Sequence, residues 1–170
     1  MDLRDFIRDI PDFPKPGILF KDITPLLASP AAFRRSVAAM TEPYRGGKID
    51  AVAAAEARGF LFAAPMALEL GCALIPMRKP GKLPYSTLSY SYALEYGEAE
   101  LHMHVDAVKP GWRVLMIDDV LATGGTMKAA CRLIEKAGAV VAGCAFLIEL
   151  GFLGGRARLA PAEVFSVVMY

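Results

Sequence analysis

The sequence has almost no net charge and no long uninterrupted hydrophobic run. Its 170 residues include 19 lysines and arginines and 18 aspartates and glutamates, which gives a formal net charge of +1 at pH 7. No global field would therefore attract nucleic acid or an anionic membrane. The richest apolar stretch, residues 51–70, is interrupted by Glu56 and Arg58 and is not expected to span a bilayer. Any anion-binding site has to be built locally.

Cysteine and histidine are also scarce. Cys72, Cys131 and Cys144 lie in apolar surroundings without metal-ligand spacing, so we expect them to be reduced core residues. His102 and His104 would share one face of a strand, but no third ligand is evident, and we interpret them as surface or flap residues rather than a metal site. The first residues lack the basic start and apolar core of a signal peptide. These features predict a cytoplasmic protein with no nucleic-acid or membrane partner.

Hydrophobic residues, by contrast, make up 55 % of the sequence, which is above the ordinary range. This content favours a well-buried sheet and an apolar subunit interface. Strands and helices alternate along the chain, which implies right-handed parallel crossovers. We therefore expect a single α/β domain over residues 1–170, with a doubly wound, mostly parallel sheet and helices on both faces. Strands are expected over 18–20, 50–55, 72–77, 113–117, 139–149 and 164–169, and helices over 2–9, 29–44, 60–70 and 127–137, with a short helix or irregular segment over 151–159.

One insertion interrupts this alternation. Residues 87–94 and 99–105 alternate polar with apolar side chains and are expected to form the two arms of a hairpin-like flap. An acid on a mobile loop can be carried to a substrate and enclosed with it, which excludes water during reaction. Glu95 at the flap tip is a candidate, although Glu98 and Glu100 lie close by and a solvated glutamate is the alternative.

The most informative stretch runs from Val114 to Thr126. A continuous apolar strand is followed by Asp118 and Asp119, then by Thr-Gly-Gly-Thr at the start of a helical pattern. Backbone N–H groups and the helix dipole make such a turn a good phosphate site. The acid pair suits ribose hydroxyls, a hydrated Mg²⁺, or both. A strand end with a helix cap and a plain tight turn is the alternative.

Two further stretches carry charge beside turns. Residues 56–60 read Glu-Ala-Arg-Gly-Phe between a strand and a helix, where an arginine and a helix start could together hold a diphosphate. A surface ion pair between Glu56 and Arg58 is the alternative. Residues 78–84 read Arg-Lys-Pro-Gly-Lys-Leu-Pro, the densest basic cluster in the chain. A charge run alone is more often a solvated loop.

These stretches together resemble one family. The run from Val114 to Thr126 resembles the 5-phosphoribosyl 1-diphosphate (PRPP) binding motif of type I phosphoribosyltransferases. Residues 13–22, 56–60, 78–84 and 94–97 are similar, in the same order, to segments of the adenine phosphoribosyltransferases. The resemblance covers residues 13 to about 162 and implies the type I phosphoribosyltransferase fold. It also implies an N-terminal base-binding hood over about 1–28, a flexible hairpin flap over about 82–105, and a homodimer.

The resemblance assigns a role to each motif. It implies PRPP and AMP binding by Asp118, Asp119, Ala122, Thr123, Gly124, Gly125 and Thr126, diphosphate binding by Glu56, Ala57, Arg58, Arg78 and Lys82, and adenine binding by Leu19, Phe20 and Lys21. Phe20 would stack on the purine while the backbone of its two neighbours bonds the purine edge. Arg78 would act across the dimer interface, and Glu95 would lie near adenine N7 or N9 during proton transfer.

Two alanines depart from related patterns. The family's diphosphate loop carries a non-proline cis peptide, which would fall between Glu56 and Ala57, and Ala57 stands where serine is common. Ala122 stands where hypoxanthine-guanine relatives have an aspartate that serves the purine N7. An alanine cannot do this, which argues against a 6-oxo purine as the base.

The implied activity is the conversion of adenine and PRPP to AMP and diphosphate in purine salvage, a pentosyltransferase reaction that uses Mg²⁺. The metal would be held through the substrate diphosphate and water, and Asp118 and Asp119 could contribute. Two alternatives remain at this point. One is a transferase for another base, and the other is a non-catalytic PRPP-sensing regulator that has kept the fold.

Overall fold

A five-stranded parallel sheet forms the centre of the computed structural model, which describes residues 1–93 and 97–170. The sheet order is β4-β3-β7-β8-β9, and every neighbouring pair is parallel. The strands are β3 (Ala51–Ala55), β4 (Ala73–Met77), β7 (Arg113–Leu121), β8 (Val140–Glu149) and β9 (Val164–Met169). The predicted doubly wound sheet is therefore confirmed.

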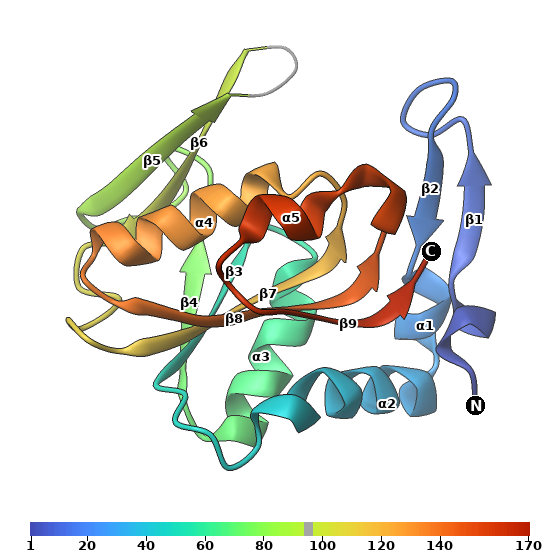
Figure 1. Cartoon of the computed structure of the whole chain (residues 1–170), viewed down its shortest axis with the longest axis horizontal. Coiled ribbons are helices and arrows are strands. Elements are labelled where there is room, and N and C mark those ends of the chain that lie inside the picture. Colours follow the sequence, from blue (N-terminus) through green and yellow to red (C-terminus); the bar gives the residue numbers. More distant parts are fainter. Residues whose placement is uncertain (94–96) are drawn as a thin grey trace.

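Helices cover both faces of this sheet (Figure 1). They are α1 (Thr24–Ala28), α2 (Pro30–Thr41) and α3 (Gly59–Leu70) on one face and α4 (Gly125–Lys136) and α5 (Gly155–Leu159) on the other. Strand β3 shows how the two cores divide, because successive side chains of a strand point to opposite faces. Ala51, Ala53 and Ala55 belong to the α4 side, whereas Val52 and Ala54 belong to the α3 side. All five side chains are buried, so this alanine-rich strand is short but fully covered.

The order of the strands creates a switch point. In chain order, the five central strands lie as 2-1-3-4-5, so the winding direction reverses between β3 and β7. In open α/β sheets, ligands bind in the crevice beyond the carboxyl ends of the strands at such a point. The register shows that β3 last pairs at Ala54 with Ile117 of β7. Strand β7 continues past this pair to Leu121 alongside β8, so its next residues face the turn that follows β3.

Two small antiparallel sheets flank this crevice. Strands β1 (Arg8–Pro11) and β2 (Leu19–Asp22) form the N-terminal sheet, and β5 (Thr87–Ala93) and β6 (Glu98–His104) form the predicted hairpin. They stand at opposite sides of the molecule in Figure 1. An isolated bridge between Arg78 and His102 joins the hairpin to the end of β4.

Several predicted boundaries are wrong. The helix expected over 2–9 is a short 3-10 turn, Leu3–Phe6, followed by β1, because pairing with β2 outweighs the propensity of so short a helix. The strand expected over 18–20 runs on to Asp22 as β2, and α1, which was not expected, begins at Thr24. Helix α2 ends at Thr41, and a separate 3-10 turn, Glu42–Tyr44, carries the chain onward.

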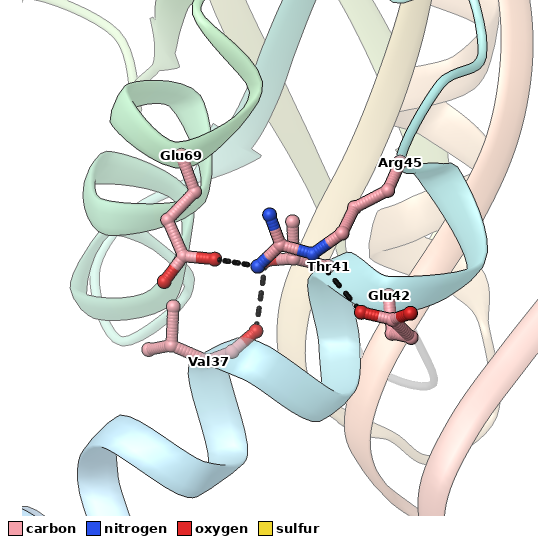
Figure 2. A network of polar contacts seen from close by, with 5 residues as sticks. All are labelled: Val37, Thr41, Glu42, Arg45 and Glu69. Atoms are coloured by element: carbon pink, nitrogen blue, oxygen red, sulfur yellow. Dashed lines mark hydrogen bonds and ion pairs between the residues drawn. The ribbon is translucent and has the colours of Figure 1, made fainter.

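Polar contacts at the end of α2 link it to α3 (Figure 2). The Arg45 guanidinium lies 3.0 Å from Glu42 Oε2 and 2.5 Å from Glu69 Oε2, and the Thr41 hydroxyl donates to the Val37 carbonyl at 2.8 Å. Exposed ion pairs of this kind contribute about 0–1 kcal/mol each. The two helices are therefore held mainly by the apolar core beneath them.

The structure places two of the three cysteines in the core, whereas Cys72 is only half-buried. All three cysteines are free thiols, with Cys131 and Cys144 buried. Within residues 1–93 and 97–170, no helix is both long and apolar enough to cross a membrane.

Candidate active site

A cavity of about 430 Å³ opens at the switch point. It is lined by the turn after β3 (Glu56, Ala57, Arg58) and by the continuous run from Asp118 to Met127. Two motifs that lie about sixty residues apart in the chain thus form one site. The seven residues assigned to PRPP and AMP binding from the sequence all lie on its wall, as do Glu56, Ala57 and Arg58 of the diphosphate set.

The turn from β7 into α4 is built from backbone. Gly124 has a left-handed conformation with φ of +79°, and α4 begins at the next residue. No side chain among the described residues caps this helix, and its first turn contains no acid. The first N–H groups of a helix have no partner within it, so they are available to an anion.

The segment from Gly155 to Arg158 packs closely against this turn and holds it in place. A Cβ added at Gly155 would collide with the carbonyl oxygen of Ala122, and one added at Gly124 would lie 2.9 Å from the carbonyl oxygen of Gly155. Arg158 Nη1 also lies 3.5 Å from the Thr123 carbonyl, and Lys128 donates to the Arg158 carbonyl at 3.0 Å. Only glycine permits this contact between the two backbones.

The acid pair lies inside β7 rather than after it, which corrects the predicted strand end at Ile117. The Asp119 N–H donates to Asp118 Oδ1 at 2.9 Å. A Cβ added at Gly59 would lie 2.9 Å from the same oxygen, so α3 begins directly against this carboxyl group. Burial first, and then the neighbouring Asp119 carboxylate, raise the pKa of Asp118 well above its ordinary value.

The two charged residues of the turn after β3 have different partners. Arg58 Nε lies 2.8 Å from Asp119 Oδ2, and Asp119 is only 3 % exposed. Glu56 instead accepts from Arg78 Nε at 2.7 Å and from the Lys79 N–H at 3.1 Å. The hydrogen bond from Arg78 holds the pKa of Glu56 below its usual value despite partial burial. The alternative of a Glu56–Arg58 ion pair is not found among the described residues.

The peptide bond between Glu56 and Ala57 is cis, as the resemblance implies. Arg78 and Lys82 do not line the cavity, whereas Lys79 lines a neighbouring one. Arg78 reaches the site through Glu56, and Lys82 is exposed.

The N-terminal sheet adjoins the same turn. The Arg58 guanidinium carbon lies 5.0 Å from the centre of the Phe20 ring, within cation–π distance. Phe13 packs edge-on against Phe20, also with 5.0 Å between ring centres. Leu19 is half-exposed, whereas the Lys21 side chain is buried and directed at Asp9. Only the backbone of Lys21 is therefore available to a ligand here.

The hairpin encloses a second cavity of about 680 Å³, which shares Glu56 and Thr126 with the first. The Tyr92 hydroxyl lies 3.4 Å from Thr126 Oγ1, so the hairpin directly contacts the turn from β7 into α4. Glu95, the predicted acid, lies outside the described residues. Glu98 and Glu100 line the second cavity.

The two histidines lie in the hairpin, on β6, and have polar partners there. His102 Nδ1 lies 2.9 Å from Thr87 Oγ1 and its Nε2 lies 3.2 Å from Glu100. His104 Nε2 accepts from the Tyr85 N–H at 3.3 Å. In the parts of the chain that the structure describes, no group of three or more histidine, cysteine or acidic side chains could hold a metal ion.

Sequence reasoning missed three contributors, namely Gly59, Gly155 and Arg158. Gly59 was visible as part of the Arg-Gly-Phe turn but not as the residue that makes room for Asp118. No signal in the sequence connects Gly155 or Arg158 with a turn more than thirty residues earlier, because that contact exists only in the folded chain.

Comparison with known proteins defines the class first. Residues 22–166 match the family model described as a phosphoribosyl transferase domain. The chain is 59 % identical over 170 residues to an adenine phosphoribosyltransferase of Rhodopirellula baltica, covering 100 % of this chain and 82 % of that protein.

Solved structures agree with this relationship. A crystal structure of adenine phosphoribosyltransferase from Thermoanaerobacter pseudethanolicus has a TM-score of 0.96 at 50 % identity, covering 99 % of this chain and 98 % of that one. The Saccharomyces cerevisiae enzyme, complexed with an imino-altritol bisphosphate and adenine, has a TM-score of 0.91 at 37 % identity, covering 97 % and 96 %. The chain therefore belongs to the adenine phosphoribosyltransferase family.

Proposed function

We propose that this protein transfers the phosphoribosyl group of PRPP to adenine, forming AMP and diphosphate in purine salvage. The observation that carries the proposal is the 430 Å³ cavity, which combines an arginine, two carboxylates and an uncapped helix N-terminus. These groups match a diphosphate, a ribose and a 5′-phosphate respectively. Membership of the adenine phosphoribosyltransferase family supports the same reaction.

The helix N-terminus would anchor the substrate. In this proposal the N–H groups from Thr123 to Thr126 bind the 5′-phosphate, and the close contact with Gly155 keeps them in a fixed array. Fixed donors cost no reorganisation when the substrate binds. The anomeric carbon is thereby positioned for displacement.

The acid pair and Arg58 would act on the sugar and the leaving group. Asp118 and Asp119 bind the ribose hydroxyls, and Arg58 exchanges its contact with Asp119 for the diphosphate. The bond between C1 and the diphosphate oxygen breaks as a bond from C1 to adenine N9 forms. Positive charge develops on the sugar during this step, and the buried carboxylates stabilise it electrostatically. We assign Ala57 a backbone role and Lys82 a contact with the departing diphosphate, while Glu56 holds Arg78.

The donor set also fits Mg²⁺. This cation keeps several waters and binds one or two carboxylates together with substrate phosphates, rather than a protein cage. Asp118 and Asp119 supply two carboxyl groups at the cavity wall, and the remaining ligands would be diphosphate oxygens and water. Bound there, the ion would neutralise charge on the leaving group.

The base would lie between the N-terminal sheet and the hairpin. Phe20 stacks on adenine, and the backbone of Leu19 and Lys21 reads its edge, which favours a 6-amino over a 6-oxo purine because unpaired buried groups are costly. Glu95 receives the N9 proton. Ala122 offers no carboxylate to N7, which supports this division of labour.

We further propose a single cytoplasmic domain, residues 1–170, that acts as a homodimer and has no nucleic-acid or membrane partner. Exposed leucines support an interface on α3 and the edge strand β4: Leu68 is 85 % exposed, and Leu61 and Leu74 are also exposed. In a dimer of this kind, Arg78 would exchange its contact with Glu56 for the partner's diphosphate. Residues 1–28 act as the hood and 82–105 as the flap.

A base screen tests the proposal. PRPP-dependent nucleotide formation is followed with adenine, hypoxanthine, guanine and uracil, each with Mg²⁺ present. We expect turnover with adenine alone. A preference for hypoxanthine or uracil would identify a transferase for another base. Background turnover with all four at saturating PRPP would instead identify a PRPP-sensing regulator.

A further inference from the structure

Residues outside the active site connect the base-binding strand to the central sheet. Lys21 is 8 % exposed, although its strand belongs to a two-stranded sheet at the edge of the molecule. Its ammonium nitrogen lies 2.6 Å from Asp9 Oδ1 and 3.7 Å from the centre of the Tyr170 ring. The lysine is therefore held between a carboxylate of β1 and an aromatic face.

The two contacts of Lys21 have different roles. Asp9 and Lys21 are register partners across β1 and β2, so their ion pair joins the two strands to each other. It does not join them to anything else. A two-stranded sheet is marginally stable by itself in water, so its position depends on contacts with the rest of the fold.

Tyr170 supplies such a contact with the central sheet. Its N–H donates to the Glu149 carbonyl at 2.9 Å, and its carbonyl accepts from the Gly151 N–H at 2.9 Å. Glu149 is the last residue of β8, paired with Leu121 of the strand that carries the acid pair. The Tyr170 backbone is thus fixed to the central sheet, and the face of its ring lies against the Lys21 ammonium.

We propose that Tyr170 is a positioning residue for the purine, acting through the Lys21 ammonium to hold the backbone of Leu19 and Lys21 at a fixed distance from the acid pair. The proposal rests on the function given above, because it assigns base recognition to that backbone. A cation over a ring that is shielded from water is held more strongly than one at an exposed site. The Lys21 side chain is then a structural cation and not a ligand for phosphate or base.

Steady-state kinetics of matched variants test this role. Tyr170→Ala is expected to raise the KM for adenine about fivefold to tenfold, because one partly buried cation–π contact is lost. The KM for PRPP should stay within about twofold. Tyr170→Phe keeps the ring and should restore the wild-type adenine KM. Met169→Ala, at the exposed neighbouring side chain, is the control for damage to the end of β9.

A double variant tests the coupling. Lys21→Met removes the charge and keeps an unbranched apolar stem. It should raise the adenine KM at least as much as Tyr170→Ala does, because it also removes the ion pair with Asp9. The combined variant should be no worse than Lys21→Met alone, because Lys21→Met already removes the cation that the Tyr170 ring contacts. Additive effects, an unchanged adenine KM, or a Tyr170→Phe variant as impaired as Tyr170→Ala would each overturn the proposal.

Hydrogen exchange of the ligand-free protein separates this inference from the proposed function. In Tyr170→Ala, the amides of β1 and β2 are expected to exchange about tenfold faster, while those of β7 and β8 stay protected. This result would support the anchoring whichever base the enzyme accepts. Unchanged exchange in β1 and β2 would refute it even in an enzyme that turns over adenine normally.

Discussion

The two strand-to-helix turns of the active site face the same cavity but are stabilised in opposite ways. The turn after β3 is held by charged side chains, with Glu56 paired to Arg78 and Arg58 lying against Asp119. The turn after β7 has no charged side chain of its own from Val120 to Met127. It is held mainly by backbone contact with Gly155, and Arg158 adds one contact, 3.5 Å from the Thr123 carbonyl.

This difference matches what each turn is proposed to bind. A 5′-phosphate remains bound to the sugar throughout the reaction, so a rigid array of N–H donors suits it. A diphosphate gains charge and departs, so a mobile guanidinium with an alternative carboxylate partner suits it. The first turn should therefore be sensitive to loss of charge and the second to any added side-chain volume.

The largest effect is expected where both turns depend on the acid pair. Asp118→Asn combined with Asp119→Asn should lower kcat/KM for PRPP by on the order of a thousandfold, since both sugar contacts and the Arg58 partner are lost. Initial rates at varied PRPP measure this. Asp106→Asn, at an exposed acid that does not line the cavity, is the control. Near-normal activity of the double variant would show that Asp118 and Asp119 do not bind the ribose.

The backbone-held turn can be tested by adding one methyl group. Gly155→Ala should lower kcat/KM for PRPP by about a hundredfold, because the new Cβ collides with the Ala122 carbonyl and displaces the turn. Gly151→Ala is the matched control, since its Cβ would lie 3.4 Å from its nearest neighbour, in the same segment. Equal activity of the two alanine variants would show that the turn does not need Gly155.

These glycines also mark where sequence reasoning ends. The parallel sheet, the acid pair and the Thr-Gly-Gly-Thr turn could be predicted, because strand periodicity and turn chemistry are local properties. The extension of β7 to Leu121 could not, since it depends on pairing with β8. Two further contacts, of Gly155 with Ala122 and of Lys21 with the Tyr170 ring, also depend on distant parts of the chain.

A charge removed from the turn after β3 should have an intermediate effect. Arg58→Gln is expected to lower kcat/KM for PRPP about tenfold to a hundredfold, because one charge-assisted contact with diphosphate is lost. In the reverse reaction the KM for diphosphate should rise while the KM for AMP changes little. Arg34→Gln, at an exposed arginine of α2, controls for net charge. If the AMP and diphosphate constants rise together, Arg58 does not distinguish the two ligands.

The smallest effect separates binding from stability within the acid pair. The pKa of Asp118 is raised in the folded protein by burial and by Asp119, so its ionised form opposes folding. Asp118→Asn should therefore raise the Tm of the ligand-free protein, by about 2–4 °C for each kcal/mol of penalty that it removes in a chain of this length.

The sign of the pH dependence follows from the direction of that shift. Between the ordinary aspartate pKa and the raised folded value, the unfolded chain loses its proton while the folded protein keeps it, so the wild type loses stability as pH rises. The Tm difference between Asp118→Asn and wild type should thus widen across this range and level off above it, as differential scanning calorimetry from pH 4 to 9 can measure. Asp106→Asn should show no such widening. A difference that is constant with pH would mean that Asp118 carries no penalty for its charge, and the site would then hold its ribose ligand without the stored electrostatic strain that its burial implies.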